Sequence, residues 1–267
     1  MTSKSRLSAI FAVLLVGVVS VIAAGCGGSG GGGGSEKLTV GSDIPYPPFE
    51  QGKPGHYTGF DIELMDAVAE SIGREPEFQD TSFETIFRDL AQGKFEAVAS
   101  ATTITPEREK SVDFTNPYYL SEQAILVKEG SPIKSVEDLN GATVAVQQGT
   151  TGQEFVKKET EPGELRAFPE GPDAVNALKA GTVDAVVIDL PVAQNAVEAQ
   201  SGLEISAAIP TEEEYGFVVA QGETELLEEL NEGLKEVEED GTYAKIYEKW
   251  FHREPPRAIF SATHTAS

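Results

Sequence analysis

The chain has few of the residues that build disulfide frameworks, metal centres and nucleic-acid surfaces. Cys26 is its only cysteine, and it has three histidines in 267 residues. A single cysteine excludes an internal disulfide, and no His, Cys or carboxylate cluster has metal-ligand spacing. Acidic residues number 44 against 20 basic ones, for a formal net charge of −24. This balance argues against nucleic acid as a partner and against docking on anionic lipid through a basic patch.

The N-terminus has the pattern of an export signal. Two basic residues precede an apolar run over residues 7–22, and small residues follow it up to Cys26. The run is also nearly long enough to anchor the chain in a bilayer. The nine residues after Cys26, GGSGGGGGS, predict a flexible tether, which favours cleavage. We therefore predict a signal segment over residues 1–26 and a tether over residues 27–36.

The stretch AAGC, which ends at Cys26, resembles the lipobox of bacterial lipoproteins. In that motif the cysteine becomes the lipid-bearing first residue of the mature chain, although Ala23 stands where leucine is more common. The resemblance implies a protein anchored to the cell membrane through lipid on Cys26, on the periplasmic side or the outer face. As a random coil the tether would span roughly 15 to 18 Å.

Two stretches of the chain repeat one pattern. Residues 89–102 and residues 177–190 each contain a helix end, a glycine, an acidic residue and an Ala-Val strand start. Gly93 and Gly181 stand at matching places, as glycines that close a helix. A weaker repeat pairs the short strand after Leu38 with one after Ala142. Two similar α/β units are therefore predicted.

Apolar residues at helical spacing predict helices over residues 62–72 and 83–90. Because strands and helices alternate along the chain, we predict an α/β fold with mostly parallel sheets. Ligands of such folds lie beyond the carboxyl ends of the strands. The residues that follow each repeated strand are therefore candidates for a binding site.

Arg108 lies at such a position, in the stretch TTITPERE. Thr105 and Pro106 are typical of an N-cap and a first helical position, so a helix is predicted to begin there. Arg108 then falls in the first turn, where the helix dipole favours an anion and not a cation. The arginine is either solvated beside nearby acids or holds an anionic ligand.

Asp189 ends the second repeated strand, at the place that Ala101 has in the first repeat. It can simply cap a helix that begins at Pro191. If the two strand ends face each other, however, Arg108 with Thr103 suits a carboxylate and Asp189 suits an ammonium group. An α-amino acid carries both groups.

Along the chain stand the stretches YPPFE, YTGFDIEL, TITPEREKSVDFTNPYY, DLNGATVAVQQGTTG, DAVVIDLP and EEDGTYAKIYEKWF. In their sequence, order and spacing they resemble the polar amino-acid branch of the bacterial solute-binding proteins, family 3, which serve ABC importers. The resemblance runs from Lys37 to Phe251. It implies a type II periplasmic-binding-protein-like fold with two α/β lobes, joined by hinge strands near residues 121–127 and 215–219. The implied segments are lobe 1 over residues 37–123 and 217–252, lobe 2 over residues 124–216, and a polar tail over residues 253–267.

The same resemblance assigns the ligand contacts. It implies that Arg108 holds the ligand carboxylate in a forked, charge-assisted contact, and that Asp189 takes the α-ammonium group. Asp43 is placed at the distal end of the ligand. The other implied contacts are the Thr103 side chain, backbone groups near Ala101 and Thr151, the aromatic walls Tyr46 and Phe83, and Gln147. Without the resemblance, the two aromatic residues would be interpreted as core.

An acid such as Asp43 favours a guanidinium, ammonium or amide group and disfavours a second carboxylate. Gln147 stands where glutamine receptors of this family often have lysine and basic amino-acid receptors have leucine. Gly152 replaces a polar side chain common in the basic class, and Ile188 offers no hydrogen bond. Arginine or lysine, supported by cation–π attraction, is the leading prediction, followed by glutamine.

Two other functions compete with that of a receptor. An enzyme of the cyclic-acid dehydratase type shares the scaffold, but the sequence has no nucleophile elbow and no phosphate-binding glycine motif. A ligand-sensing module is the other, although no further apolar span follows the domain. We expect a monomeric, non-enzymatic protein that needs no metal or other cofactor and delivers its ligand to ABC-transporter membrane subunits.

Overall fold

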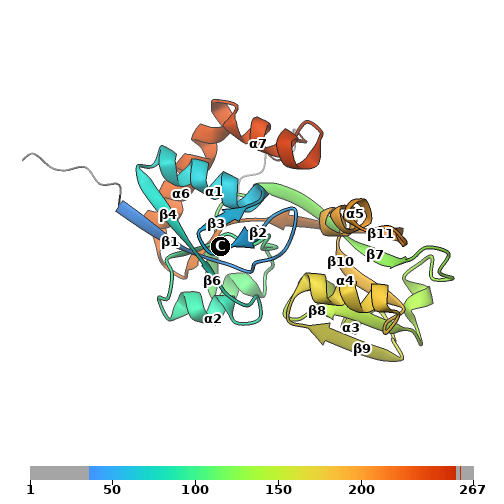
Figure 1. Ribbon diagram of the computed structural model, residues 1–267. Coiled ribbons are helices and arrows are strands. Elements are labelled where there is room, and N and C mark those ends of the chain that lie inside the picture. Colours follow the sequence, from blue (N-terminus) through green and yellow to red (C-terminus); the bar gives the residue numbers. More distant parts are fainter. Residues whose placement is uncertain (1–35, 257–258, 260–267) are drawn as a thin grey trace, which may run out of the picture. The chain divides into compact units, whose positions relative to one another are not determined.

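The computed structural model of the chain describes residues 36–256 and residue 259. They form two five-stranded sheets, a short hairpin, seven α-helices and two 3-10 helices (Figure 1). The predicted signal segment, Cys26 with its lipobox, and nearly all of the tether lie outside the described residues, as does most of the predicted tail. Residue 36, predicted to end the tether, already belongs to the first strand.

The two sheets repeat one strand order. The first is β4-β1-β5-β12-β6 and the second is β9-β8-β10-β7-β11. In each sheet four strands run in one direction, and only β12 or β7 runs against them. The strands of the first sheet are β1 (Glu36–Ser42), β4 (Arg74–Asp80), β5 (Ala97–Val98), β6 (Val112–Phe114) and β12 (Val218–Ala220). Those of the second are β7 (Tyr119–Lys128), β8 (Thr143–Gln147), β9 (Glu164–Phe168), β10 (Ala185–Asp189) and β11 (Leu203–Tyr215), and the separate hairpin pairs β2 (Gln51–Lys53) with β3 (His56–Thr58).

The predicted repeat is thus visible as equivalent positions, because β5 and β10 are the central strands of their sheets. Each follows a glycine in the left-handed region, Gly93 at φ 69° and Gly181 at φ 75°, which ends the preceding helix. The strands of the weaker repeat, β1 and β8, also have equivalent positions, since β1 pairs in parallel with β5 and β8 pairs in parallel with β10. The prediction of mostly parallel sheets is correct for four strands of each five.

Helices cover both faces of each sheet. In the first sheet Ala97 and Val219 pack in one apolar cluster with α1, whereas the neighbouring Val98 and Val218 pack in another with α2. Figure 1 shows α1 and α2 on opposite sides of these strands. Burial on both faces explains why the central strands β5 and β10 are apolar almost throughout, whereas the edge strand β4 is polar and alternates in burial. The helices are α1 (Phe60–Ser71), α2 (Ile86–Ala91), α3 (Thr151–Glu159), α4 (Gly171–Ala180), α5 (Leu190–Ala199), α6 (Thr224–Glu239) and α7 (Thr242–Phe251), with 3-10 helices η1 (Arg108–Lys110) and η2 (Glu137–Leu139).

The chain passes between the sheets twice. It leaves the first sheet after β6 and enters the second at β7, so residues 115–118 form the first connection. It returns through residues 216–217, between β11 and β12. The predicted hinge strand over residues 121–127 lies within β7, just after the first connection, and the one over residues 215–219 spans the second connection. The lobe limits drawn from the sequence stay predictions.

No helix among the described residues is long and apolar enough to cross a membrane. The apolar run over residues 7–22, which the sequence analysis interprets as an export signal or an anchor, is not among those residues.

We expect Gly59→Ala to destabilise the fold strongly. Gly59 has φ 137°, and a Cβ there would lie 1.9 Å from the carbonyl oxygen of Phe49. Backbone strain and the clash should together cost about 2 to 5 kcal/mol of unfolding free energy. Gly55→Ala is the matched control, because Gly55 also has positive φ but has open space around it. Equal losses in urea denaturation of the two variants would contradict the close approach at Gly59.

Candidate ligand-binding site

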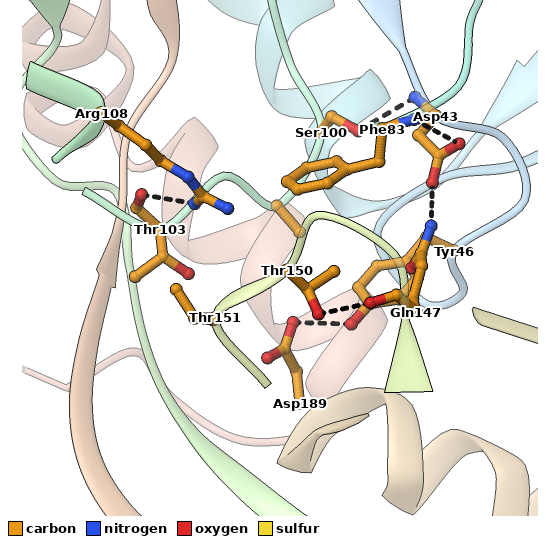
Figure 2. A pocket seen from close by; sticks show the side chains of 11 residues that line it. Asp43, Tyr46, Phe83, Ser100, Thr103, Arg108, Gln147, Thr150, Thr151 and Asp189 are labelled. Carbon is orange, nitrogen blue, oxygen red and sulfur yellow. Dashed lines mark hydrogen bonds between the residues drawn. The ribbon is translucent and has the colours of Figure 1, made fainter. Parts of the chain in front are cut away.

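A cavity lies where the carboxyl ends of strands from both sheets meet (Figure 2). All nine residues predicted as ligand contacts line it, together with Ser100 and Thr150. The structure therefore brings the predicted residues together, while their roles as ligand contacts stay predictions. The nine are Asp43, Tyr46, Phe83, Ala101, Thr103, Arg108, Gln147, Thr151 and Asp189.

The helix predicted to begin after Thr105 is a short 3-10 helix, η1, whose first residue is Arg108. Thr105 does act as a cap, since its Oγ1 accepts a hydrogen bond from the Arg108 N–H at 3.2 Å. Strand β6 begins at Val112, however, so the chain has room for one helical turn only. A single 3-10 turn has little macrodipole, and the environment of Arg108 is set by tertiary contacts instead.

The Arg108 guanidinium is held in place but not neutralised. Nη1 donates to the carbonyl oxygen of Thr103 at 2.7 Å, and Nη2 donates to that of Gly149 at 3.3 Å. Its Cζ lies 5.3 Å from the ring centroid of Phe83 and 5.2 Å from that of Phe87, in cation–π range. No carboxylate of the described residues lies within salt-bridge distance of it.

Burial lowers the pKa of Arg108 to about 10, while the carboxylates of Glu213 and Asp189 act to raise it. The side chain therefore remains a cation at neutral pH. A positioned guanidinium without a salt-bridge partner can bind a carboxylate in a forked contact. Phe83, predicted as a wall for the ligand side chain, also stacks on this cation.

Asp189 occupies the backbone position of an N-cap for α5, but its side chain makes no capping hydrogen bond. Instead Oδ2 accepts from the Tyr46 hydroxyl at 2.7 Å, and Oδ1 accepts from Nε2 of Gln123. The interpretation of Asp189 as a simple helix cap is therefore wrong. Burial, followed by the charge of Glu213, raises the pKa of Asp189 to about 7. An approaching ammonium group would favour the ionised form.

Glu213 is a buried acid that the sequence analysis missed. Its Oε2 accepts from the hydroxyl groups of Thr103 at 2.8 Å and Thr151 at 3.1 Å, and Oε1 accepts from Gln123 at 3.0 Å. It thereby joins a loop that follows β5 in the first sheet to the first residue of α3 beside the second. Glu213 sets the orientation of both threonines at the cavity.

Glu213 was missed because PTEEEY has the composition of an exposed acidic run. A register shift in β11 between Ile209 and Glu213, with Glu212 at φ 51°, turns the Glu213 side chain inward. Alternation counted back from the buried Tyr215 is the sequence signal that could have found it.

Asp43 closes the other end of the cavity. It is only 2% exposed, and its Oδ1 accepts from the Phe83 N–H while Oδ2 accepts from Nε2 of Gln147. Burial, followed by the charge of Glu170, raises the pKa of Asp43 to about 7. Gln147 also donates to the carbonyl oxygen of Pro169 at 3.1 Å. Asp43 and Glu170 are both acids, and Gln147 is the side-chain amide that donates to Asp43 from the other sheet. This end of the cavity is therefore suited to a cation.

Helix α3 directs its N-terminus to the same cavity. Thr150 is its N-cap, and the side-chain oxygen accepts from the Gln153 N–H at 3.2 Å. Gly149 at φ 81° turns the chain into the helix. The amide of Thr151 is one of the first backbone donors of the helix, a position that favours an anion.

Gly152 has a packing reason that the sequence did not reveal. A Cβ at this position would lie 2.7 Å from Oε1 of Gln123, the side chain that bridges Asp189 and Glu213. The polar residue expected from basic-class relatives would displace Gln123. In this chain Gln123 donates to Asp189, and Gly152 leaves the space that the Gln123 side chain occupies.

The cavity has a volume of about 10 Å³. This is close to the minimum for one water and far too small for an amino acid. The Tyr46–Asp189 and Gln147–Asp43 hydrogen bonds both cross it. Ligand entry therefore requires these contacts to break, after which the same polar groups can bind the ligand. No His, Cys or carboxylate group suited to a metal ion was found among the described residues.

Residues 38–253 match a family described as bacterial extracellular solute-binding proteins, family 3. ArtP of Bacillus subtilis (strain 168), an arginine-binding extracellular protein, is 34% identical over 221 residues, which are 81% of this chain and 86% of ArtP. TcyJ of Escherichia coli (strain K12), an L-cystine-binding protein, is 31% identical over 218 residues, which are 80% of this chain and 82% of TcyJ.

Two solved structures are similar over most of the chain. An ancestral arginine-binding protein bound to glutamine has a TM-score of 0.78 and 42% identity, covering 81% of this chain and 98% of that chain. AncCDT-1, an ancestral amino acid-binding protein and precursor of cyclohexadienyl dehydratase, has a TM-score of 0.74 and 41% identity, covering 80% and 95%. The predicted two-lobed α/β fold class is confirmed.

We expect the ligand-free protein to be less stable at pH 8 than at pH 5. Burial raises the pKa of Asp43 and Asp189 to about 7, and that of Asp61 to about 6. The folded state thus binds these protons more tightly than the unfolded chain does. The resulting stability is complete below about pH 4 and is lost as pH rises through 6 to 7, by on the order of a few kcal/mol.

Thermal unfolding between pH 5 and pH 8 measures this dependence. Asp43→Asn should flatten the profile, because an amide has no proton to lose. A wild-type melting temperature that rises from pH 5 to pH 8 would contradict the burial of these acids.

Proposed function

The chain belongs to the bacterial extracellular solute-binding proteins, family 3, and we propose that it binds a cationic α-amino acid in the cavity between its two sheets. L-Arginine is the first candidate, L-lysine the second and L-glutamine the third. The observation that carries the proposal is the position of Arg108, a cation without a salt-bridge partner among the described residues, across the cavity from the buried Asp189.

These two groups match the two charges that every α-amino acid carries. Arg108 binds the carboxylate, with the Thr103 hydroxyl and the first amides of α3 as further donors. Asp189 binds the ammonium group once Tyr46 releases its carboxylate oxygen. The electrostatic pattern favours a zwitterion over a free carboxylate or a free amine, since either of those leaves one group unpaired.

The far end of the cavity supports a cationic side chain. Asp43 faces it, and the charge of Glu170 adds to the negative potential there. A guanidinium can donate hydrogen bonds to Asp43 in place of the Gln147 amide, which donates to it in this structure. Arginine fits these acceptors better than lysine because its planar fork has more donors. Tyr46 and Phe83 flank the side chain.

Membership of the family supports closure of the cavity around the ligand and a function in transport. Rearrangement of residues 115–118 and 216–217, the two connections between the sheets, allows the cavity to open and to close around the ligand. The closed form is delivered to the membrane subunits of an ABC importer. We also propose cleavage of a signal peptide before Cys26, a lipid anchor on Cys26, and a monomeric state.

Enzymatic turnover is the second candidate function. The similarity to AncCDT-1, a precursor of a dehydratase, favours it, as do cavity acids whose pKa is raised to about 7 and which can donate a proton at neutral pH. Mass spectrometry of candidate ligands after incubation tests it. Recovery of unchanged ligand excludes the enzyme, and a dehydrated product would favour it over the receptor.

A thermal-shift panel of the common amino acids and a few polyamines tests the proposed function. The protein is first refolded from denaturant to remove carried ligand. Ligand at a hundred times its dissociation constant should add about 2.7 kcal/mol of stability. We expect a saturable shift with L-arginine that is larger than those with L-lysine and L-glutamine. A polyamine shift without any amino-acid shift would overturn the α-amino acid proposal.

We expect Arg108→Ala and Asp189→Asn each to weaken L-arginine binding by about 2 to 5 kcal/mol, because each variant leaves one ligand charge unpaired in a closed cavity. Calorimetric titration measures the loss. Arg166→Ala and Asp184→Asn are matched controls, since Arg166 pairs with Glu164 on the surface and Asp184 accepts from the Thr143 amide away from the cavity. Wild-type affinity in either cavity variant would refute the site.

A further inference from the structure

Two acids behind the cavity have no function in the ligand contacts described above. Glu50 and Asp61 are both 0% exposed. Backbone hydrogen bonds hold their segments together, because the N–H groups of Phe60 and Asp61, at the start of α1, donate to the carbonyl oxygens of Pro48 and Phe49. The turn that ends at Glu50 is thereby fixed against the first turn of α1.

No Lys, Arg or His of the described residues forms a salt bridge with Glu50. The charged groups with the largest effects on its pKa are Asp61, Asp43 and Asp189, all of them acids. Neither oxygen of Glu50 receives a hydrogen bond from an N–H or O–H group of the described residues, and the same holds for Oδ1 of Asp61. The polar contact of Glu50 is with the Asp61 carboxyl group itself.

Two ionised carboxylates in contact in a dry interior would repel each other and leave several acceptors unsatisfied. One shared proton removes both problems, since a protonated Glu50 can donate to Oδ1 of Asp61. Burial and the charge of Asp61 raise the pKa of Glu50 well above its usual range. Burial also raises the pKa of Asp61 to about 6, against the lowering effect of its hydrogen bonds with Tyr118, Ala101 and Glu50.

The other oxygen of Asp61 connects this pair to the cavity. Oδ2 accepts from the Ala101 N–H at 2.7 Å and from the Tyr118 hydroxyl. Ala101 lines the cavity and has φ 41°, a backbone conformation that alanine rarely adopts without support. The Asp61 carboxylate supplies that support, and residues 101–103 lead directly from it to the Arg108 contact.

We propose that Glu50 and Asp61 share a single proton, and that this acid pair is a positioning element which holds the Ala101 backbone in the shape that binds the ligand carboxylate. The protonated Glu50 keeps Asp61 ionised, and the ionised Asp61 accepts two hydrogen bonds on one oxygen. A second proton, added below about pH 6, weakens the hold on Ala101. The groups that face the pair are Tyr46 and Asp43 after β1, Tyr118 before β7, Asp189 on β10 and Tyr243 on α7.

Infrared difference spectroscopy tests the shared proton without any ligand. Wild-type protein at pH 8.5, where Asp43 and Asp189 with a pKa of about 7 are ionised, should show a carboxylic-acid carbonyl band that shifts in heavy water, and Glu50→Gln should lose it. Asp66→Asn is the matched control, because Asp66 lies on the same helix but is exposed, so the band should remain. Absence of the band in wild type, or its persistence in Glu50→Gln, would overturn the shared proton.

Calorimetric titration with L-arginine tests the positioning role, and this part rests on the proposed function. Glu50→Ala and Asp61→Asn should each weaken binding about tenfold or more, the first by leaving Asp61 charged and unpaired and the second by weakening the acceptor for Ala101. Glu50→Gln should restore most of the affinity lost in Glu50→Ala, since the amide still donates to Asp61. Asp66→Asn should bind like wild type.

The outcomes separate the two proposals. If folded Asp61→Asn protein, judged by its circular dichroism, binds L-arginine with wild-type affinity, the pair has no positioning role. If wild-type protein binds no amino acid, the proposed function fails while the infrared result still decides the shared proton. Equal losses of affinity in Glu50→Gln and Glu50→Ala would contradict the donor role of Glu50.

Discussion

The central constraint on this protein is the burial of acidic groups around a cavity in which, among the described residues, Arg108 is the only basic one that lines it. Each buried carboxylate must accept hydrogen bonds, share a proton or be neutralised by a bound cation, because the interior does not solvate charge as water does. The three solutions occur side by side. Glu213 has hydroxyl and amide donors, Glu50 is proposed to share a proton with Asp61, and Asp43 and Asp189 are proposed to bind the cationic groups of the ligand.

This constraint links the fold to ligand binding. The carboxyl ends of β1, β5, β8 and β10 bring polar residues from two equivalent sheets to one place, where each sheet supplies partners for the other. Tyr46 reaches Asp189, and Gln147 reaches Asp43, so the protein's own groups occupy positions that a zwitterion with a basic side chain would take. The proposed ligand would exchange these internal hydrogen bonds for bonds to itself. This exchange limits the net gain in binding free energy, so affinity would depend on how well the ligand fits.

The family resemblance implied six of the nine predicted cavity residues, whereas the local sequence predicted the α/β class, the repeated glycine-closed helices, and Thr103, Arg108 and Asp189 after the repeated strands. These depend on short-range rules: apolar spacing, left-handed glycines and the position of polar residues after buried strands. The same rules failed at residues 105–110, where the start of β6 leaves room for one 3-10 turn only, and at Asp189, whose capping position does not fix where its side chain points.

The sequence by itself determined which predicted residues line the cavity, because strand ends and family motifs can be recognised from short stretches of neighbouring residues. Only the tertiary structure decided how they interact. Glu213 turns inward at a register shift in β11, a side chain at Gly152 would displace Gln123, and Asp61 accepts a hydrogen bond from the Ala101 N–H. These contacts join residues far apart in the chain, and their energies depend on burial and on neighbouring charges, neither of which local sequence specifies.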